Sequence, residues 1–420
     1  MSTVGPAAPA TESAGGASDT RVIAVVGLAH GVSHFFQLIL APLFPWLKEA
    51  FGLSYAELGL TMTLLFVVSS IGQSLSGFLV DRVGPLRVML GALGLFALAA
   101  LVLAASPGYA ALLAGAVLVG LGNASFHPID YSILNARVST RRIGHAYAVH
   151  GVTGNLGWAA APVFLVGITQ LASWRTAFAA ASLLALVVLV VVWRNRALLE
   201  APVRRAAAAA AAAAQPARSG DTFAFLRLPE VWLSFAFFAA YAFALGGVQT
   251  FAPEAARLLH GVRAEWVALC LTVYMLGSAG GSLLGGFLAG DADRAERVIG
   301  LCFGVAATIA ISLGLAPWPG WSIPLLFAAM GLASGVANPS RDMLIRRAAP
   351  PGATGRVYGV VYSGLDLGSS LAPAAFGLLM DAHQPKLVWL GIAAAQAALI
   401  AGAFRAGRAT RVRNAAPGTA

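Results

Sequence analysis

The apolar segment 22–46 contains His30, His34 and Gln37. Their spacing of four and three residues places them on one face of an α-helix. His34 falls about 18 Å along such a helix from Val22, close to the middle of a bilayer about 30 Å thick. Because an imidazole exchanges protons near neutral pH, proton transfer is one interpretation. The other is a neutral histidine bonded to a backbone carbonyl in the helix packing.

A second polar group lies in the segment 109–136, which contains His127, Asp130 and Tyr131. Asp130 follows His127 by three residues, so the two can pair across one helix face, although Pro128 between them can kink the helix. An ionisable side chain at membrane depth is costly unless it is paired or hydrated, which makes both residues candidates for substrate or proton handling. Alternatively, Asp130 holds two helices together and His127 helps to shape the helix.

The segment 322–347 contains Asn338, Arg341 and Asp342. Arg341 stands 211 positions after Asp130, at the period of the repeat described below, so we expect the two opposite charges to face each other and to pair when one side of a cavity closes. Arg341 could instead hold an anionic substrate group through its planar guanidinium. A third interpretation is that Arg341 and Asp342 satisfy neighbours near the membrane surface.

Asp366, in the segment 355–381, is the carboxylate predicted to lie nearest the middle of the bilayer, about 16 Å along the helix from Gly355. Such a carboxyl group suits the loading and release of a proton. The alternative is a structural bond to a neighbouring helix. The other residues expected to line a pathway are Asn155, Tyr241 and Gln249, together with His150 and Tyr362.

The composition excludes an ordinary soluble protein. Of the 420 residues, 59% are hydrophobic and 10% are charged, against about 25% charged in soluble proteins. Runs of 18 or more apolar residues are typical of membrane helices. We therefore predict an all-α polytopic membrane protein with twelve transmembrane helices, at 22–46, 55–80, 87–106, 109–136, 144–171, 175–194, 230–257, 265–289, 297–316, 322–347, 355–381 and 387–405.

The two halves of the chain repeat one another with a period of 211 residues. Across the stretch 120–164, His127 aligns with Asn338 and Gly157 with Gly368. The matches concentrate on Gly, Pro and Tyr, which indicates shared backbone geometry. A self-match over half the chain predicts two copies of one unit. Two pseudo-symmetric six-helix bundles in the same orientation suit alternating access around a central site.

We expect bundles at 21–194 and 230–406, a cytoplasmic linker at 195–229, a disordered tail at 1–20 and a C-terminal tail at 407–420. Basic residues set the orientation in the membrane. With both termini cytoplasmic, as in a bacterial-type inner membrane, the loops on the inside would hold all but five of the 27 Lys and Arg residues. Those five are Lys48, Arg175, Arg257, Arg263 and Lys386.

The stretch 77–87, GFLVDRVGPLR, resembles a loop of the major facilitator superfamily, G-x-L-x-D-R-x-G-R-R. The matching residues are Gly77, Asp81, Arg82, Gly84 and Arg87. The resemblance implies a cytoplasmic gate between the second and third helices. We expect Gly77 to allow close helix approach and Gly84 to allow the tight turn.

Within that superfamily, S-F-H-P at 125–128 and G-N-L-G at 154–157 resemble the fosmidomycin-resistance group. The group is described as drug-exporting proton antiporters, so the resemblance implies proton-coupled efflux. One departure concerns the residues after His34, where Phe35-Phe36-Gln37-Leu38 lacks the acidic residue of the group's pattern. A coupling role for this helix would then fall on His34 or on another part of the chain.

The sequence thus predicts a secondary active transporter that moves a small organic solute across the inner membrane by alternating access, as proton-coupled efflux of a drug or metabolite. Proton-coupled uptake of an organic anion is the alternative, favoured by Arg341 and the histidines. A non-transporting membrane sensor would need an appended folded domain.

With no P-loop, metal-ligand spacing or nucleophile elbow in the sequence, we expect neither an enzyme nor a cofactor. The expected partners are a small-molecule substrate, protons and the lipid bilayer, without nucleic acid, and the chain is expected to be a monomer.

Overall fold

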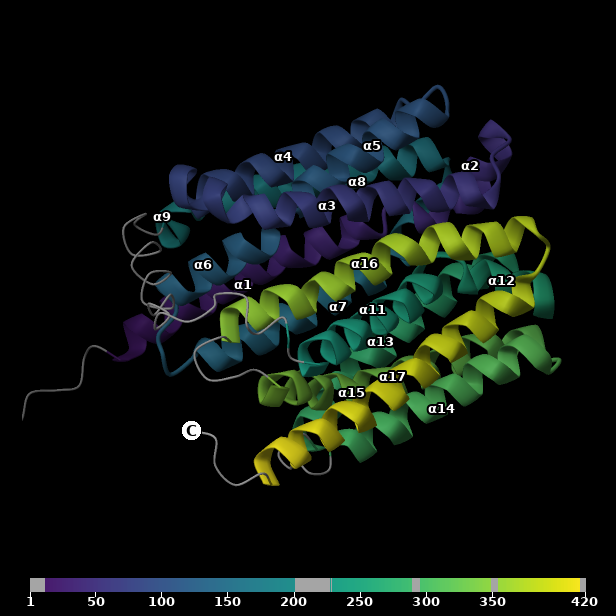
Figure 1. Cartoon of the computed structure of the whole chain (residues 1–420). Coiled ribbons are helices and arrows are strands. Elements are labelled where there is room, and N and C mark those ends of the chain that lie inside the picture. The colour runs from purple at the N-terminus through teal and green to yellow at the C-terminus, as the bar shows by residue number, and fades with distance from the viewer. Residues whose placement is uncertain (1–11, 201–226, 228, 289–294, 349–353, 416–420) are drawn as a thin grey trace, which may run out of the picture.

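The computed structural model describes residues 12–200, 227, 229–288, 295–348 and 354–415. Within these residues it is helical, without a strand, and the long helices run side by side in one general direction (Figure 1). The first half contains α1 (Glu12–Gln37), η1 (Ala41–Leu43), α2 (Phe44–Phe51), α3 (Tyr55–Val83), α4 (Pro85–Ala104), α5 (Tyr109–Asn123), α6 (Phe126–Arg137), α7 (Ile143–Leu171), α8 (Trp174–Arg194) and α9 (Arg196–Leu199).

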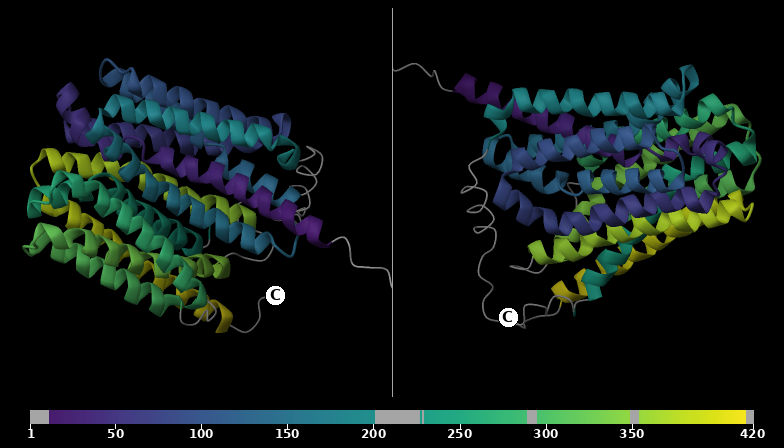
Figure 2. Two further views of the ribbon diagram at one scale, coloured as in Figure 1. Left: turned by 180° about the vertical axis from the view of Figure 1, so that it is seen from behind. Right: turned by 90° about the horizontal axis from the view of Figure 1, so that it is seen from above.

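The second half contains α11 (Pro229–Thr250), α12 (Ala252–His260), α13 (Ala264–Leu288), α14 (Ala295–Leu315), η3 (Gly320–Ser322), α15 (Ile323–Ala348), α16 (Thr354–Asp381) and α17 (Pro385–Ala415). Figure 2 shows the two halves from behind and from above. In the described part of the chain, 11 helical segments are long and apolar enough to cross a membrane. The 28-residue α16 occupies the place of the remaining predicted segment.

Two of the predicted membrane segments are broken where proline removes a backbone donor. The segment predicted at 109–136 divides into α5 and α6, just before Pro128. Pro128 has no N–H to give to Ala124, the residue directly after α5, which favours a break at this position. In the same way, α1 ends at Gln37, and Pro42 lies in the short helix η1 that follows. α7, α15 and α16 nevertheless continue through Pro162, Pro339 and Pro373.

The helices extend into both predicted tails. α1 begins at Glu12, so the prediction of a disordered tail at 1–20 is wrong for residues 12–20. Near the end of this extension, Asp19 Oδ2 accepts a 2.6 Å hydrogen bond from Ser139 Oγ, which ties this part of α1 to the residues after α6. α17 likewise continues to Ala415, into the predicted tail at 407–420. Residues 1–11 and 416–420, and most of the predicted linker (201–226 and 228), lie outside the described residues.

Glycines make the same helix contact in each half. A Cβ at Gly120 of α5 would meet the backbone carbonyl of Leu65 in α3, and a Cβ at Gly331 of α15 would overlap that of Tyr274 in α13. These pairs are related by the offsets of 211 and 209 residues that relate the two half-sequences. The repeat therefore reflects packing in which only a hydrogen atom fits between two helices, as in many membrane proteins.

The two halves are joined by a symmetric pair of hydrogen bonds. Thr63 Oγ1 of α3 donates to the carbonyl oxygen of Ser370 in α16, at 2.7 Å. Thr272 Oγ1 of α13 donates to the carbonyl oxygen of Ala159 in α7, at 2.9 Å. Thr63 and Thr272 are repeat partners, and so are Ala159 and Ser370. The α3–α16 and α7–α13 contacts are therefore two copies of one interface, which can be followed in Figure 1.

We predict opposite effects on stability from two alanine substitutions in α7. A Cβ at Gly157 would overlap the Gly31 carbonyl oxygen of α1, whereas a Cβ at Gly167 has nothing within 4 Å. Gly157→Ala should lower the free energy of unfolding by about 1–3 kcal/mol because it overpacks the contact. Gly167→Ala should raise it by about 0.5–1 kcal/mol. Thermal unfolding of the purified protein in detergent measures both, and equal melting temperatures would contradict the packing described.

Candidate functional site

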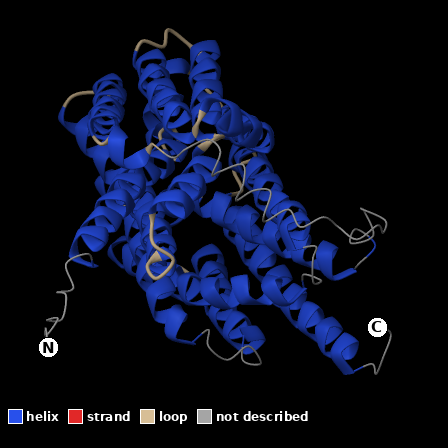
Figure 3. Ribbon diagram, turned by 90° about the vertical axis from the view of Figure 1, so that its left-hand side faces the viewer, coloured by secondary structure: helices blue, strands red, loops and turns tan. Residues whose placement is uncertain are grey.

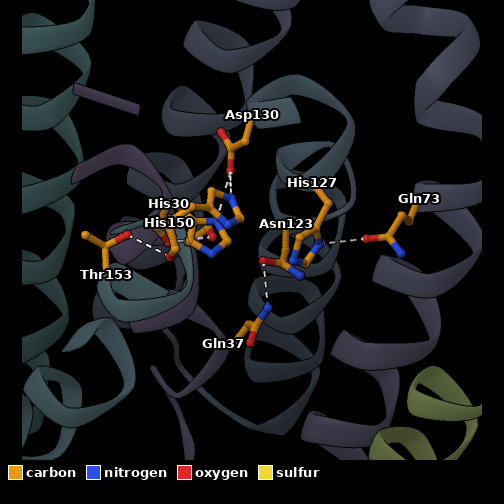
Figure 4. Close-up of polar contacts among 9 residues, drawn as sticks. His30, Gln37, Gln73, Asn123, His127, Asp130, His150 and Thr153 are labelled. Carbon is orange, nitrogen blue, oxygen red and sulfur yellow. Dashed lines mark hydrogen bonds and ion pairs between the residues drawn. The ribbon is translucent and has the colours of Figure 1, made fainter. Parts of the chain in front are cut away.

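Five buried or half-buried ionisable side chains converge inside the first half. They are His30 and His34 of α1, His127 and Asp130 of α6, and His150 of α7, here called the histidine cluster. All of them except His34 are labelled in Figure 4. Asp130 is fully buried, and its Oδ2 lies 2.9 Å from His30 Nδ1 and 3.0 Å from His150 Nε2. The His30 and His150 rings stack with their centroids 3.5 Å apart. One carboxylate therefore holds together helices α1, α6 and α7.

Small residues on α7 make room for the imidazoles of α1. The rings of His30 and His34 lie 4.4 Å apart, so the predicted shared helix face is confirmed. A Cβ at Gly154 would come within 2.8 Å of His34 Cε1 and 3.0 Å of His30 Nε2. A side chain at this position would force both histidines to move. The G-N-L-G motif thus has a direct steric role beside the cluster.

His34 does not match the expectation of an imidazole bonded to a backbone carbonyl. Both of its ring nitrogens are buried and lack a hydrogen-bond partner within the described part of the chain. The ring packs instead against the indole of Trp158, with 4.2 Å between centroids. Its nitrogens retain the capacity to bind a proton, a ligand or an ion, since buried polar groups are normally satisfied.

A chain of amides borders the cluster and connects four helices. Trp158 Nε1 donates to Gln37 Oε1 at 2.9 Å, and Gln37 Nε2 donates to Asn123 Oδ1 at 3.1 Å. Asn123 Nδ2 donates in turn to Ser69 Oγ at 2.8 Å. Only Gln37 was predicted as a site residue. Ser69, Asn123 and Trp158 are common residue types in helices. Only tertiary packing brings them together, and the spacing of residues within each segment does not predict that contact.

His127 lies at the edge of the cluster. Its Nδ1 is 3.1 Å from Gln73 Oε1 of α3. The predicted pairing of His127 with Asp130 along one helix face is therefore not the main contact of either residue. Asp130 pairs with histidines of α1 and α7, which approach from the other side.

The predicted pair between Asp130 and Arg341 across the two halves is not the contact that the structure shows. Asp130 is enclosed by its own half, and the Arg341 guanidinium of α15 lies over the Tyr241 ring of α11, 4.4 Å from its centroid. Tyr241 is the repeat partner of His30, just as Arg341 is that of Asp130. The same two positions therefore touch within each half, as carboxylate with imidazole in one and guanidinium with phenol ring in the other.

Asp366 lies at the crossing of α16 and α3, where the two halves meet. It is half-buried, and the hydroxyl group of Ser70 in α3 lies within hydrogen-bonding reach of its carboxyl group. Of the other predicted pathway residues, Asn338 donates through Nδ2 to Ser282 Oγ at 3.1 Å. Asn155 donates to the Gly151 carbonyl of its own helix at 3.1 Å. Gln249 is buried and lines a small cavity between the halves near α2 and α12.

The structure brings the predicted residues together only in part. His30, His34, Gln37 and the residues of α6 form one continuous site, and His150 joins it. Asn338, Tyr241 and Arg341 belong to the second half, and Asp366 marks the interface.

Comparison with known proteins fixes the family. The family model described as Major Facilitator Superfamily matches residues 26–373, with a further match over 260–418. The chain belongs to the major facilitator superfamily. Its helical fold and family make it a multi-pass membrane transporter related to bacterial transporters, as the motif at 77–87 predicted.

Several superfamily members are similar in sequence. The fosmidomycin resistance protein of Escherichia coli is 25% identical over 374 residues, 88% of each chain. The uncharacterized MFS-type transporter YfnC of Bacillus subtilis is 29% identical over 188 residues, 42% of this chain and 44% of that one. A probable 4-methylmuconolactone transporter of Cupriavidus pinatubonensis is 31% identical over 153 residues, 36% of each. The last two matches thus span less than half of those relatives.

Solved structures show the same superfamily fold. A bacterial homolog of the human lysosomal transporter Spinster, in an inward-facing and occupied conformation, superposes with a TM-score of 0.76 at 17% identity, covering 95% of this chain and 99% of that one. The human organic anion transporter MFSD10 (TETRAN) gives a TM-score of 0.67 at 17% identity, covering 92% and 99%.

The superfamily loop between α3 and α4 is only partly as predicted. Gly84 has φ +96° and separates the two helices, which confirms the tight turn. Asp81, Arg82 and Arg87 are exposed. A Cβ at Gly77 would meet nothing within 4 Å, so the expected close helix contact is absent at this glycine. The part of α3 that does pack tightly on the second half is its beginning, near Tyr55 and Gly59.

A group of charged residues that the sequence did not suggest closes the end of the superfamily fold near α2 and α12. Asp381, the last residue of α16, accepts hydrogen bonds from the backbone N–H groups of Tyr55 (2.7 Å) and Ala56 (2.8 Å) at the start of α3. Tyr55 Oη donates to Glu254 Oε1 at 3.0 Å. Glu254 also receives both hydrogen bonds of Arg257, which raises the pKa of that guanidinium. These five residues are here called the interface latch.

We predict that Asn123 is required for the stability of the first half. Asn123→Leu would leave the Gln37 amide and the Ser69 hydroxyl without their partner and should lower the free energy of unfolding by about 1–3 kcal/mol. Asn155→Leu is the matched control, because Asn155 bonds only to its own helix. Thermal unfolding in detergent compares the two, and equal losses would contradict a structural role for the amide chain.

Proposed function

We propose that this chain is a proton-coupled exporter of small organic compounds in a bacterial-type inner membrane, working by alternating access as a monomer with both termini cytoplasmic. The observation that carries the proposal is the carboxyl group of Asp366 at the crossing of the two halves. A group that gains and loses a proton there can couple protonation to the movement of one half against the other. The relative that matches 88% of the chain is named for fosmidomycin resistance, which supports export.

Asp366 and Ser70 bring a titratable group to the contact between α3 and α16. Ser70 Oγ donates to the Phe66 carbonyl oxygen of its own helix at 2.6 Å, and its hydroxyl group lies near the Asp366 carboxyl group. A change in the charge of Asp366 would therefore act directly on this contact between the halves.

The closed end of the molecule supports an inward-facing state. The interface latch and the two threonine bonds join the halves, and α2 and α12 lie at the end opposite the two chain termini (Figure 1). Figure 3 looks along the helices from the end where the termini lie. With cytoplasmic termini, the latch is the periplasmic gate. We infer that Gly77, Asp81, Arg82, Gly84 and Arg87 close the cytoplasmic side in the opposite state.

We predict that Asp366→Asn abolishes proton coupling. The amide keeps the size of the carboxyl group but cannot exchange a proton in the physiological range, so solute-driven pH changes in proteoliposomes should disappear while solute binding remains. Glu265→Gln is the matched control, because Glu265 is an exposed carboxylate of the second half. Intact coupling in Asp366→Asn would show that the carboxyl group is structural.

We also predict that Asp381→Asn opens the interface latch. The carboxylate accepts two N–H groups at a helix N-terminus, an interaction that contributes about 1–2 kcal/mol. Its loss should shift the population of the two states about 5–30-fold toward the one in which this end is open. Tyr55→Phe should act in the same direction, since it removes the bond to Glu254.

Electron spin resonance distances measure this shift. Spin labels at the exposed positions Glu49 and Lys386 report the separation of the halves at the latch, after replacement of Cys270 and Cys302. Asp381→Asn should increase the fraction of long distances. Unchanged distance distributions would mean that the latch does not hold the closed state.

The second candidate function is proton-coupled uptake of an organic anion. It is favoured by the half-buried Arg341, which stacks on Tyr241 inside the second half and presents a cation suited to a carboxylate or phosphonate. A thermal-shift screen of the purified protein against organic acids, phosphonates and drugs identifies the class of solute. Proton and solute fluxes in proteoliposomes then separate the two functions: movement of protons in the same direction as an anion, lost in Arg341→Gln, would favour uptake over export.

A further inference from the structure

We propose that the histidine cluster binds one divalent transition-metal ion, with His30, Asp130 and His150 as its protein ligands. One ligand atom from each of these residues lies within 4.8 Å of the others. Each of the three is at least nine-tenths buried. The proposal concerns a site within the first half and goes beyond the proposed coupling through Asp366, which lies on α16.

Hydrogen bonding leaves two atoms of these side chains without a partner. Asp130 Oδ2 pairs with His150 Nε2 at 3.0 Å. His30 Nδ1, which lies 2.9 Å from the same oxygen, and Asp130 Oδ1 are buried and have no hydrogen-bond partner in the described residues. Because buried polar groups are normally satisfied, a cation that accepts a lone pair from both the imidazole nitrogen and the carboxylate fits this site.

The charge balance of the cluster points the same way. The stacked rings of His30 and His150, 3.5 Å apart, would repel strongly if both carried a proton charge. Neutral imidazoles offer free nitrogen lone pairs for metal binding. The single Asp130 carboxylate supplies one negative charge toward the two of a divalent ion. The cluster therefore resembles a ligand set more closely than an ion-pair network.

The ligand types select the class of ion. Two imidazoles and one carboxylate, with a fourth position left for water or another ligand, form a common set for Zn²⁺. Co²⁺, Ni²⁺ and Cu²⁺ also accept imidazole nitrogen. Mg²⁺ and Ca²⁺ prefer an all-oxygen shell and are disfavoured here.

A second set of three shares His30 with the first. His30, His34 and His127 also bring one ligand atom each within 4.8 Å of one another. His34 has two unpartnered nitrogens, and His127 is oriented by Gln73, as metal-binding histidines commonly are by a hydrogen-bonded neighbour. His127 is only half-buried, so this second set lies nearer the surface than the set of His30, Asp130 and His150.

The expectation that the chain holds no metal site came from local spacing. The proposed ligands come from α1, α6 and α7, separated by 100 and 20 positions in the chain,. No short motif joins them, and only the packing of the three helices brings them together.

The test measures Zn²⁺ binding to the purified full-length protein after treatment with a chelator. Calorimetric titration with ZnCl₂, together with elemental analysis of the dialysed protein, should give one ion per chain. His150→Gln and Asp130→Asn should each weaken binding at least about tenfold. His145→Gln is the matched control, since His145 is an exposed histidine on the same helix, and it should bind like the unmodified protein.

His127→Gln decides between the two sets. It should leave affinity within about threefold of the unmodified protein if His30, Asp130 and His150 are the ligands. If His127→Gln weakens binding and His150→Gln does not, the assignment of ligands is overturned. No measurable Zn²⁺ binding by the unmodified protein overturns the proposal as a whole.

X-ray absorption at the zinc edge provides a readout that needs no variant. The unmodified protein should show two imidazoles and one carboxylate oxygen at about 2.0–2.2 Å. A shell of oxygen alone would indicate surface binding and would contradict the proposal. Because no solute is present in these measurements, their outcome is independent of whether the chain exports, imports or couples to protons.

Discussion

Close approach of helix backbones is the constraint on which this structure depends. Inside a bilayer, apolar side chains gain little by leaving lipid for protein, so helices associate through tight packing and hydrogen bonds. Here a Cβ at Gly59 would overlap the Pro373 carbonyl oxygen of the other half, and one at Gly377 would meet the Tyr55 carbonyl. The bonds from Thr63 and Thr272 cross the same interfaces. The histidine pair of α1 is placed in the same way, beside Gly154 and Gly157 of α7.

The two halves share one arrangement of the backbone but carry different side chains at corresponding positions. Positions that hold His30 and Asp130 in the first half hold Tyr241 and Arg341 in the second, and each pair is in contact. The first half encloses its charge in a cluster of imidazoles and amides. The second half covers a cation with an aromatic ring. The duplicated fold thereby holds a group of imidazoles around a carboxylate in one half and a guanidinium beside a phenol ring in the other.

Much of the fold could be predicted because it rests on patterns local to the sequence. The length of the apolar segments predicted a membrane protein, and the repeat at an offset of 211 residues predicted two similar halves. Gly84 predicted the turn between α3 and α4. Helix periodicity correctly placed His30 and His34 on one face. Partners across helices were not predictable in this way. Asp130 had several candidate partners, and its choice of His30 and His150 over Arg341 depends on how α1 and α7 pack. The interface latch escaped prediction for the same reason, since Asp381 acts on backbone N–H groups that carry no sequence signal.

The symmetric threonine bonds have a consequence for the mechanics of the contact between the halves. Thr63 bonds to Ser370, and Thr272 bonds to Ala159, at positions related by the pseudo-two-fold axis between the halves. A symmetric separation of the halves would lengthen both bonds equally, because the pseudo-two-fold axis carries one bond onto the other.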